Sequence, residues 1–261
     1  MLKVHCISSG SCGNCTVFET EQDAVIIDAG ITLRDFDAGL DYFGVNPAKL
    51  RKVFITHRHS DHIKGAGPIS RKHRMSVVAD NYTLAEIHRA DPKIYDARVM
   101  NIGSDMSVGE MNISSFATSH DTQTSCAYCV RTADTKVCLV TDTGVITPAI
   151  AANVRGSDLL ILESNYDEEM LDESNYPAYL KHRIRSAFGH LSNGDAADFI
   201  ADFIESGGEN THFWLAHLSR ENNTPVIARA RTCELLHKAL GVDKNIEVAL
   251  RDTPSLTRCL N

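Results

Sequence analysis

Three histidines and one aspartate gather in the six residues from His57 to His62. Imidazole and carboxylate are side chains that bind divalent transition metals. In an extended segment His57 and His59 point to the same side, so both can reach one metal ion. Asp61 and His62 follow where the segment turns, and we expect them to reach a second metal about 3.5–4 Å away. A mononuclear H-E-x-x-H site would instead place two histidines four residues apart on a helix.

Further ligand-type residues follow apolar stretches later in the chain. Strand ends are where a rigid scaffold can aim distant residues at one point. Taken alone, each of these residues fits a capping or surface role, and Asp142 fits a turn before Gly144. Together they disfavour the alternative that the first segment is only a histidine-rich surface loop. The candidate metal ligands are His57, His59, Asp61, His62, His120, Asp142 and His217.

Composition limits the remaining possibilities. The chain of 261 residues can form one large α/β domain or two small ones. No apolar run approaches the ~20 residues that span a bilayer, and the first residues lack the features of a signal peptide. We therefore expect a cytoplasmic protein without membrane contact. The formal net charge of −8 argues against a generally basic nucleic-acid-binding surface, but it leaves room for a local basic strip.

Eight cysteines raise the possibility of disulfides or structural zinc. Two pairs have C-x-x-C spacing, but more than a hundred residues separate Cys12/Cys15 from Cys126/Cys129, far more than in a zinc ribbon. Without a secretion signal, disulfides are disfavoured too. We predict that Cys15 and Cys129 are buried strand residues. The cysteines predicted as small core residues are Cys6, Cys138, Cys233 and Cys259.

Strands and helices alternate along the chain. The predicted strands are Leu2–Ile7, Cys15–Glu19, Ala24–Asp28, Lys52–Thr56, Ser76–Ala79, Arg98–Asn101, Met111–Ala117, Ala127–Arg131, Lys136–Thr141, Leu159–Glu163, Thr211–Leu215 and Ile246–Ala249. The predicted helices are Thr32–Phe43, Ala66–Lys72, Asn81–Arg89, Ile146–Val154, Tyr176–Ala187, Asn193–Glu205 and Pro225–Lys238. This order predicts an α/β fold, a four-layer αββα sandwich of two mixed β-sheets flanked by helices, in a single domain of residues 1–261.

The order HxHxDH, His, Asp, His resembles the ligand order of the metallo-β-lactamase superfamily. Wider matches resemble its YycJ/WalJ-type subfamily of exonucleases, from residue 6 to about residue 225. The matching segments are Ser8–Cys15, Thr141–Gly144, Glu163–Asp167, Tyr176–Ile184, Gly189–Asn193 and Ala216–Asn223. The resemblance supports the four-layer sandwich, which we expect to be the metallo-β-lactamase fold.

This resemblance implies two divalent metal ions, and the residues leave the choice among Zn²⁺, Mn²⁺ and Fe²⁺ open. The family's roles assign one ion to His57, His59 and His120, the second to Asp61, His62 and His217, and both ions to Asp142. Asp61 also counts among the implied catalytic residues. Asp28 would orient the histidine segment by hydrogen bonding rather than bind metal. Two such cations would hold a bridging hydroxide that attacks phosphorus.

His190 resembles an additional histidine of ribonuclease Z-like members of the superfamily. There it is placed to protonate the leaving oxygen or to contact phosphate, and Glu163 would orient it. The alternative is that His190 precedes a helix that begins near Asn193, since Ser192 and Asn193 are good N-cap types. Because a helix N-terminus attracts phosphate, Ser192 and Asn193 are candidate substrate-binding residues.

The resemblance implies a dinuclear metal-dependent phosphodiesterase, with 5′-to-3′ DNA exonuclease action as the leading expectation. A basic run of Lys181, Arg183 and Arg185 could contact phosphates without sequence preference. A second basic run follows the histidine segment at Arg71–Arg74, and a solvated helix face is the alternative for both runs. The chain lacks the β-CASP insertion of RNase J-type nucleases, which leaves a smaller platform for nucleic acid.

Two other classes of function remain open. A small-molecule hydrolase of the same fold would cleave a thioester, lactone or cyclic phosphodiester, and it would have no use for the basic runs. A non-catalytic binding protein would have no reason to keep seven ligands. A β-lactamase is disfavoured because that activity is useful outside the cytoplasm. DNA against RNA, end polarity and oligomeric state stay undecided by the residues alone.

Overall fold

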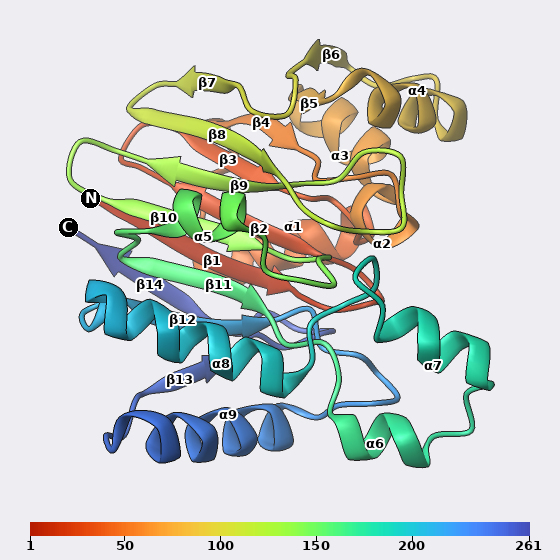
Figure 1. Ribbon diagram of the computed structural model, residues 1–261. Coiled ribbons are helices and arrows are strands. Elements are labelled where there is room, and N and C mark those ends of the chain that lie inside the picture. The colour runs from red at the N-terminus through yellow and green to blue at the C-terminus, as the bar shows by residue number, and fades with distance from the viewer.

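Two seven-stranded β-sheets pack face to face in the computed structural model, which describes all residues from 1 to 261 (Figure 1). The first sheet has the order β14 (Thr257–Leu260), β1 (Leu2–Ser8), β2 (Cys15–Glu19), β3 (Ala24–Ile27), β4 (Leu50–Phe54), β5 (Ser76–Ala79) and β6 (Asp96–Val99). The second has the order β13 (Ile246–Val248), β12 (His212–Ala216), β11 (Leu159–Glu163), β10 (Lys136–Val140), β9 (Cys126–Arg131), β8 (Met111–Ala117) and β7 (Asp105–Val108).

Both sheets are mixed. Strands β3 to β6 run parallel, whereas β14, β1, β2 and β3 pair antiparallel. In the second sheet β10 to β13 run parallel and β7 to β10 antiparallel. The predicted two-sheet α/β sandwich is therefore confirmed.

Helices cover the outer face of each sheet (Figure 1). The helices are α1 (Leu33–Phe43), α2 (Ser60–Ile63), α3 (Ala66–His73), α4 (Asn81–Ala90), α5 (Pro148–Val154), α6 (Glu168–Glu173), α7 (Ala178–Ile184), α8 (Asn193–Phe203) and α9 (Pro225–Leu240), with short helical turns at Pro47–Lys49 and Ile204–Gly208. Apolar residues of α1, α3 and α4 pack on the first sheet, and those of α5, α8 and α9 on the second. Helices α6 and α7 extend beyond the strand ends. No helix is both long enough and apolar enough to cross a membrane.

The apolar layer between the sheets also fixes the segment that carries the first histidines. Tyr128 on β9 is fully enclosed and stacks edge-on against Phe54 on β4, with ring centroids 5.7 Å apart. Its hydroxyl donates a hydrogen bond to the carbonyl of Ile55 at 2.8 Å. The Cys126 amide donates to the carbonyl of Thr56 at 3.1 Å. Burial of apolar side chains between the sheets stabilises their contact. The two hydrogen bonds set the direction in which the chain leaves β4.

Several elements differ from their predicted bounds. The sequence pattern did not predict β7, β14, α2 or α6, and it placed β4 and β6 two residues too late. It also extended α7 at both ends. Pro177 caps the start of α7, and the chain turns back after it because the His190 amide donates to the carbonyl of Ile184 at 3.0 Å. Strand β14 is defined by its pairing with β1, a partner at the other end of the chain.

A disulfide joins Cys129 to Cys138, so the prediction that disulfides are absent is wrong. The register of β9 and β10 sets these two residues opposite one another, with Cα atoms 4.1 Å apart. Cys126, which has C-x-x-C spacing with Cys129, is not its partner. An odd separation along a strand places those two side chains on opposite faces of the sheet, and Cys126 indeed faces the layer between the sheets.

The remaining cysteines divide by burial. Cys6 and Cys15 are buried as predicted. The prediction of core positions is wrong for Cys233, which is half-buried, and for Cys259, which is exposed on the edge strand β14.

A close backbone contact holds α2 in place. A Cβ atom at Gly30 would lie 1.6 Å from the carbonyl oxygen of Asp61, so only glycine fits there. The Ala29 amide donates to the carbonyl of His62 at 2.9 Å, and the Asn14 amide donates to that of Asp61 at 2.8 Å. The turn after β3 is thus docked directly on the helix that carries two of the candidate ligands.

We expect Gly30→Ala to lower the free energy of unfolding by about 1–3 kcal/mol, because the backbone of α2 must move away from the added methyl group. The same displacement should reduce bound metal. Denaturant unfolding and elemental analysis measure the two effects. Gly194→Ala is the control, since the only atom closer than 3.4 Å to its Cβ would be a carboxylate oxygen at the flexible end of Glu168. Equal stability of the two variants would show that the Gly30 contact is not limiting.

Candidate metal centre

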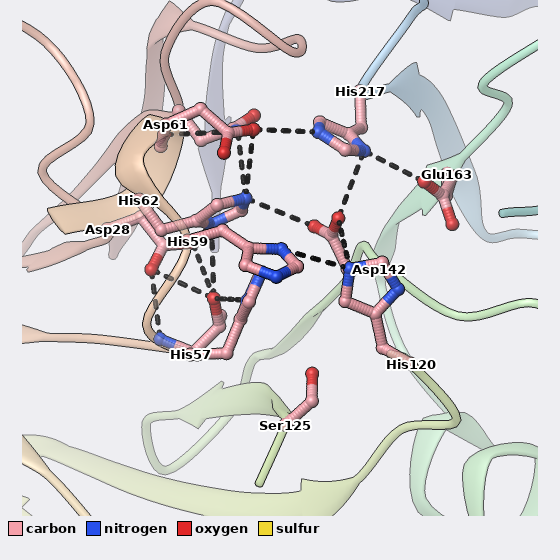
Figure 2. Close-up of polar contacts among 12 residues, drawn as sticks. Asp28, His57, His59, Asp61, His62, His120, Ser125, Asp142, Glu163 and His217 are labelled. Carbon is pink, nitrogen blue, oxygen red and sulfur yellow. Dashed lines mark hydrogen bonds and ion pairs between the residues drawn. The ribbon is translucent and has the colours of Figure 1, made fainter. Parts of the chain in front are cut away.

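All seven candidate ligands gather around one point (Figure 2). They follow the carboxyl ends of strands from both sheets. The chain leaves β3, β10 and β12 through Asp28, Asp142 and His217, whose φ angles are 61°, 57° and 55°. Positive φ is uncommon outside glycine and has an energetic cost. Such backbone strain concentrates at functional sites, where it aims side chains that a relaxed strand end would direct elsewhere.

The first group contains His57, His59 and His120, whose ligand atoms all lie within 4.8 Å of one another. His120 Nε2 and His59 Nδ1 are 3.3 Å apart. Two nitrogens bound to one zinc-like ion in tetrahedral directions, each at about 2.0–2.1 Å, are separated by roughly this distance. The predicted first metal set is therefore brought together in space.

The second group contains Asp61, His62 and His217, again within 4.8 Å of one another. One carboxylate oxygen of Asp61 lies 3.4 Å from Nε2 of both histidines. The predicted second set is likewise assembled. The turn expected at Asp61 and His62 is the short helix α2.

Asp142 lies between the two groups, as the bridging role requires. Its Oδ2 is 3.2 Å from His62 Nε2, and its Oδ1 is 3.5 Å from His120 Nε2. The side chain is only 2% exposed. One oxygen of a buried carboxylate therefore faces each group of candidate ligands.

The second ring nitrogen of four histidines is engaged elsewhere, which leaves the other nitrogen for a metal. The contacts are His57 Nδ1 to Thr56 Oγ1 at 3.0 Å, His62 Nδ1 to Asp28 Oδ2 at 2.8 Å, His120 Nδ1 to the Gly189 carbonyl at 3.1 Å and His217 Nδ1 to Glu163 Oε1 at 2.8 Å. Asp28 also accepts hydrogen bonds from the amide and hydroxyl of Thr56 at 2.9 and 3.0 Å. These hydrogen bonds to Thr56 and His62 are the contacts that the expected orienting role of Asp28 requires.

Two buried ligand atoms test whether the cluster fits divalent metal. His57 Nε2 has no hydrogen-bond partner, although the residue is fully buried. Asp142 Oδ2 also lacks one, despite the nearby His62 nitrogen. Unsatisfied buried polar atoms are costly and rare. A set of imidazoles and carboxylates with two such atoms aimed inward fits divalent metal ions.

Electrostatics support the same conclusion. Burial, together with neighbouring His62, holds the pKa of His57 well below its usual range, so this imidazole is neutral and able to bind metal. Burial opposes protonation of His62, yet the carboxylates of Asp28, Asp61 and Asp142 raise its pKa well above the usual range. The carboxylates thus require positive charge beside them. A divalent cation would supply that charge and displace the proton.

Glu163 ties the second ligand group to His190. It is fully buried at the end of β11, and its Oε1 accepts hydrogen bonds from His217 at 2.8 Å and from His190 at 2.7 Å. Although burial opposes ionisation, the two imidazoles lower the pKa of Glu163 to about 2. Its other oxygen accepts from the Thr143 amide at 2.9 Å. The expected pairing of Glu163 with His190 is present in the structure.

Asn14 and Asp121 belong to the site but were not assigned roles from the sequence. The side-chain nitrogen of Asn14, Nδ2, lies 3.1 Å from His62 Nε2 and 3.4 Å from Asp61 Oδ2. Asp121 Oδ1 lies 3.4 Å from His120 Nε2. Asn14 stands in the Ser8–Cys15 segment that carries the subfamily resemblance, and this was the available signal. Asp121 follows a candidate ligand directly.

Ser192 and Asn193 are not presented to a substrate. Ser192 caps α8, where its hydroxyl and amide bond the carboxylate of Asp195 in a capping box. Asn193 is fully buried and bonds the side chains of Ser164 and Asn223 at 2.6 and 2.9 Å. The capping interpretation therefore holds for Ser192. The capping box also occupies the start of α8, so the expected anion site there is not formed.

The three predicted basic residues already have partners within the protein. Arg183 forms an ion pair with Asp121, and its Nε donates at 2.5 Å. Lys181 donates to the carbonyl of Asp172 at 2.7 Å, and Arg185 pairs with the carboxylate of Asp172 at 2.6 Å. Of the three, only Arg183 contacts a residue beside the candidate metal ligands.

Comparisons with known proteins place this geometry in a family. Residues 24–218 match the model of the β-lactamase superfamily domain. The chain is 33% identical over 245 residues to a Bacillus anthracis protein named exodeoxyribonuclease YycJ, covering 93% of this chain and 92% of that protein. The chain belongs to the YycJ/WalJ family of the metallo-β-lactamase superfamily. It is also 32% identical over 251 residues to exodeoxyribonuclease WalJ of Streptococcus pneumoniae, covering 94% of this chain and 93% of that protein.

Solved structures agree on the fold. The metallo-β-lactamase fold protein YhfI from Bacillus subtilis matches with a TM-score of 0.75 at 16% identity, over 98% of both chains. The short form of human tRNase Z matches with a TM-score of 0.66 at 14% identity, over 99% of both chains. At such low identity these similarities establish the shared metallo-β-lactamase fold alone.

We expect Asp142→Ala to lose bound metal from both ligand groups, because its two oxygens face one group each. Elemental analysis of the purified variant, beside wild type loaded with Zn²⁺ or Mn²⁺, gives the metal content per chain. Asp158→Ala is a matched control at the opposite end of the second sheet. Normal metal content in Asp142→Ala would contradict the bridging role.

Proposed function

We propose that this protein is a dinuclear metal-dependent phosphodiesterase that degrades DNA as a 5′-to-3′ exonuclease. The observation that carries this proposal is the position of Asp142 between two sets of three ligands, with the Glu163–His190 pair alongside. The relatives at 32–33% identity are named exodeoxyribonucleases, which supports DNA as the substrate.

The three histidines of the first group would hold one divalent ion, the residues of the second group would hold another, and Asp142 would contact both. When bound, two such cations lower the pKa of a water molecule and neutralise charge on a phosphate. Zn²⁺, Mn²⁺ and Fe²⁺ all suit this donor set.

Asp61 and His190, together with the candidate ligand His59, are partly exposed members of the cluster that a substrate can reach. The side chain of Asp61 is 20% exposed and that of His190 is 21% exposed, against 2% for Asp142. Asp61 is therefore placed to orient a nucleophilic water. Because Glu163 holds Nδ1 of His190, Nε2 remains to donate a proton to the leaving oxygen. We assign Asp61 to the nucleophile side and His190 to the leaving-group side.

The surroundings of the site suit a nucleic acid better than a small molecule. Tyr179 on α7 and Phe188 in the following loop are 75% and 60% exposed, and bases stack on such aromatic rings. The loop is anchored on both sides of Phe188, since Ser119 donates to the Ala187 carbonyl at 2.7 Å and His120 to that of Gly189. Arg183 lies nearby through its pair with Asp121, so we keep it as a candidate phosphate contact.

We expect His190→Ala to keep its metal and to lose turnover by about 10²–10⁴-fold, the usual contribution of a general acid. Elemental analysis and the rate of nucleotide release measure the two effects. His182→Ala, an exposed histidine on α7, is the matched control. Loss of metal from His190→Ala would instead make this residue a part of the metal centre.

The function itself is tested with linear double-stranded DNA labelled at either end and protein reconstituted with Mn²⁺. We expect stepwise shortening from the 5′ end, and none with Asp61→Ala. Shortening from the 3′ end would contradict the polarity, and preference for RNA of the same sequence would contradict DNA as the substrate. If protein that carries metal shortens neither, a thioester, lactone or cyclic nucleotide becomes the substrate to test.

A further inference from the structure

A cavity of about 560 Å³ lies directly beside the metal centre, on the side away from α7. Its walls come from α2, the first turn of α3 and the last turn of α4. His59, a member of the first ligand group, forms part of the wall. The cavity therefore opens next to the position where a scissile phosphate would bind. The polar side chains that line it are Arg58, His59, Ser60, Lys64 and Asp91.

Arg58 is the feature of this cavity that folding does not explain. It is half-buried, and its guanidinium makes no hydrogen bond or ion pair within the protein. Its Nε is buried without a partner. A donor nitrogen that is shielded from water and has no acceptor carries a desolvation cost. A ligand that accepts hydrogen bonds from the guanidinium would remove this cost.

The other charges of the cavity favour an anion. Lys64, which follows α2, is exposed and also has no ion-pair partner. The only lining carboxylate is Asp91, and Arg71 already neutralises it at 2.6 Å. The exposed hydroxyl of Ser60 adds a neutral donor. Two unpaired cations and a hydroxyl are the groups that bind phosphate in nucleic-acid-binding proteins.

The basic residues on the opposite side of the site behave differently. Arg183 and Arg185 are each neutralised by an aspartate, and Lys181 is held by a carbonyl. In a chain with a formal net charge of −8, unpaired positive charge next to the candidate ligands therefore lies on the α2 side. Arg58 and Lys64 thus differ from the basic residues of α7 in having no partner within the protein.

We propose that this cavity binds a backbone phosphate of the DNA strand whose end occupies the metal centre, with Arg58 as the main contact and Lys64 as a second. The planar guanidinium suits two phosphate oxygens, and such a contact gives affinity without sequence preference. The inference rests on the proposed nuclease function and adds the path that the strand follows away from the site.

Binding tests the proposal separately from cleavage. Metal-loaded protein is titrated into a fluorescein-labelled single-stranded 12-mer with phosphorothioate linkages, and anisotropy is followed at several salt concentrations. We expect Arg58→Gln to weaken Kd about tenfold and to reduce the slope of log Kd against log salt by about 0.7, the value for one lost phosphate contact on a single strand. Arg58→Lys should restore the slope, because it keeps the charge.

The matched control is Arg131→Gln, an exposed arginine without a partner at the far end of β9. It should bind like wild type. Metal content of each variant is measured in parallel, since a purely structural role of Arg58 would change metal content and not the salt slope. An unchanged slope in Arg58→Gln, or a wild type that binds no DNA, would overturn the proposal.

A second set of oligonucleotides locates the phosphate. Each carries one neutral methylphosphonate linkage at a different position. Wild type should lose affinity for one of them, and Arg58→Gln should show no additional loss for that same oligonucleotide. If each methylphosphonate linkage lowers the affinity of wild type and of Arg58→Gln by the same factor, Arg58 does not contact any of these phosphates. If Arg58→Gln changes the salt slope but wild type does not cleave DNA, the cavity binds phosphate and the nuclease function is rejected. If wild type cleaves DNA but Arg58→Gln leaves the salt slope unchanged, the nuclease function stands and the cavity assignment is rejected.

Discussion

The carboxylate of Asp142 brings negative charge into a site that is almost closed to water, and the surrounding structure follows from the need to compensate it. No lysine or arginine reaches this carboxylate. Its neighbours are imidazoles from strand ends of both sheets, held by Asp28 and Glu163 behind them. This arrangement places positive charge beside Asp142 only when the histidines are protonated or when they bind cations. Metal binding and stability of this end of the sandwich are therefore coupled.

Such a site needs the two sheets in one fixed relative position, because each contributes ligands that the other lacks. The apolar layer between them supplies the free energy, but it is the pair of hydrogen bonds from β9 to Ile55 and Thr56 that fixes the direction of the first histidines. Gly30 then allows α2 to approach the turn after β3. A small change in this packing would be felt first at Asp61 and His62, since they lie on the helix that the turn supports.

The two sides of the metal centre differ in chemistry. On one side, Glu163 and His190 form a hydrogen-bonded pair. The exposed rings of Tyr179 on α7 and Phe188 in the following loop lie on the same side. On the other side, unpaired Arg58 and Lys64 face a cavity. A phosphodiester chain suits both sides, because it has a leaving oxygen that must be protonated and further anionic phosphates along the strand. The asymmetry of the site thus matches a strand that enters on one side and continues along the other.

The sequence by itself determined the family and the layered fold, and it predicted the candidate ligands that the fold brings together, because residue spacing and apolar periodicity are local properties of the chain. It also predicted the contact between Glu163 and His190, through resemblance. Tertiary structure decided what depends on partners distant in the chain. It paired Cys129 with Cys138 and β14 with β1, and it used Ser192 as a cap. It paired Arg183 with Asp121 and left Arg58 without a partner. Whether a charged side chain forms an ion pair depends on which residues the fold places next to it.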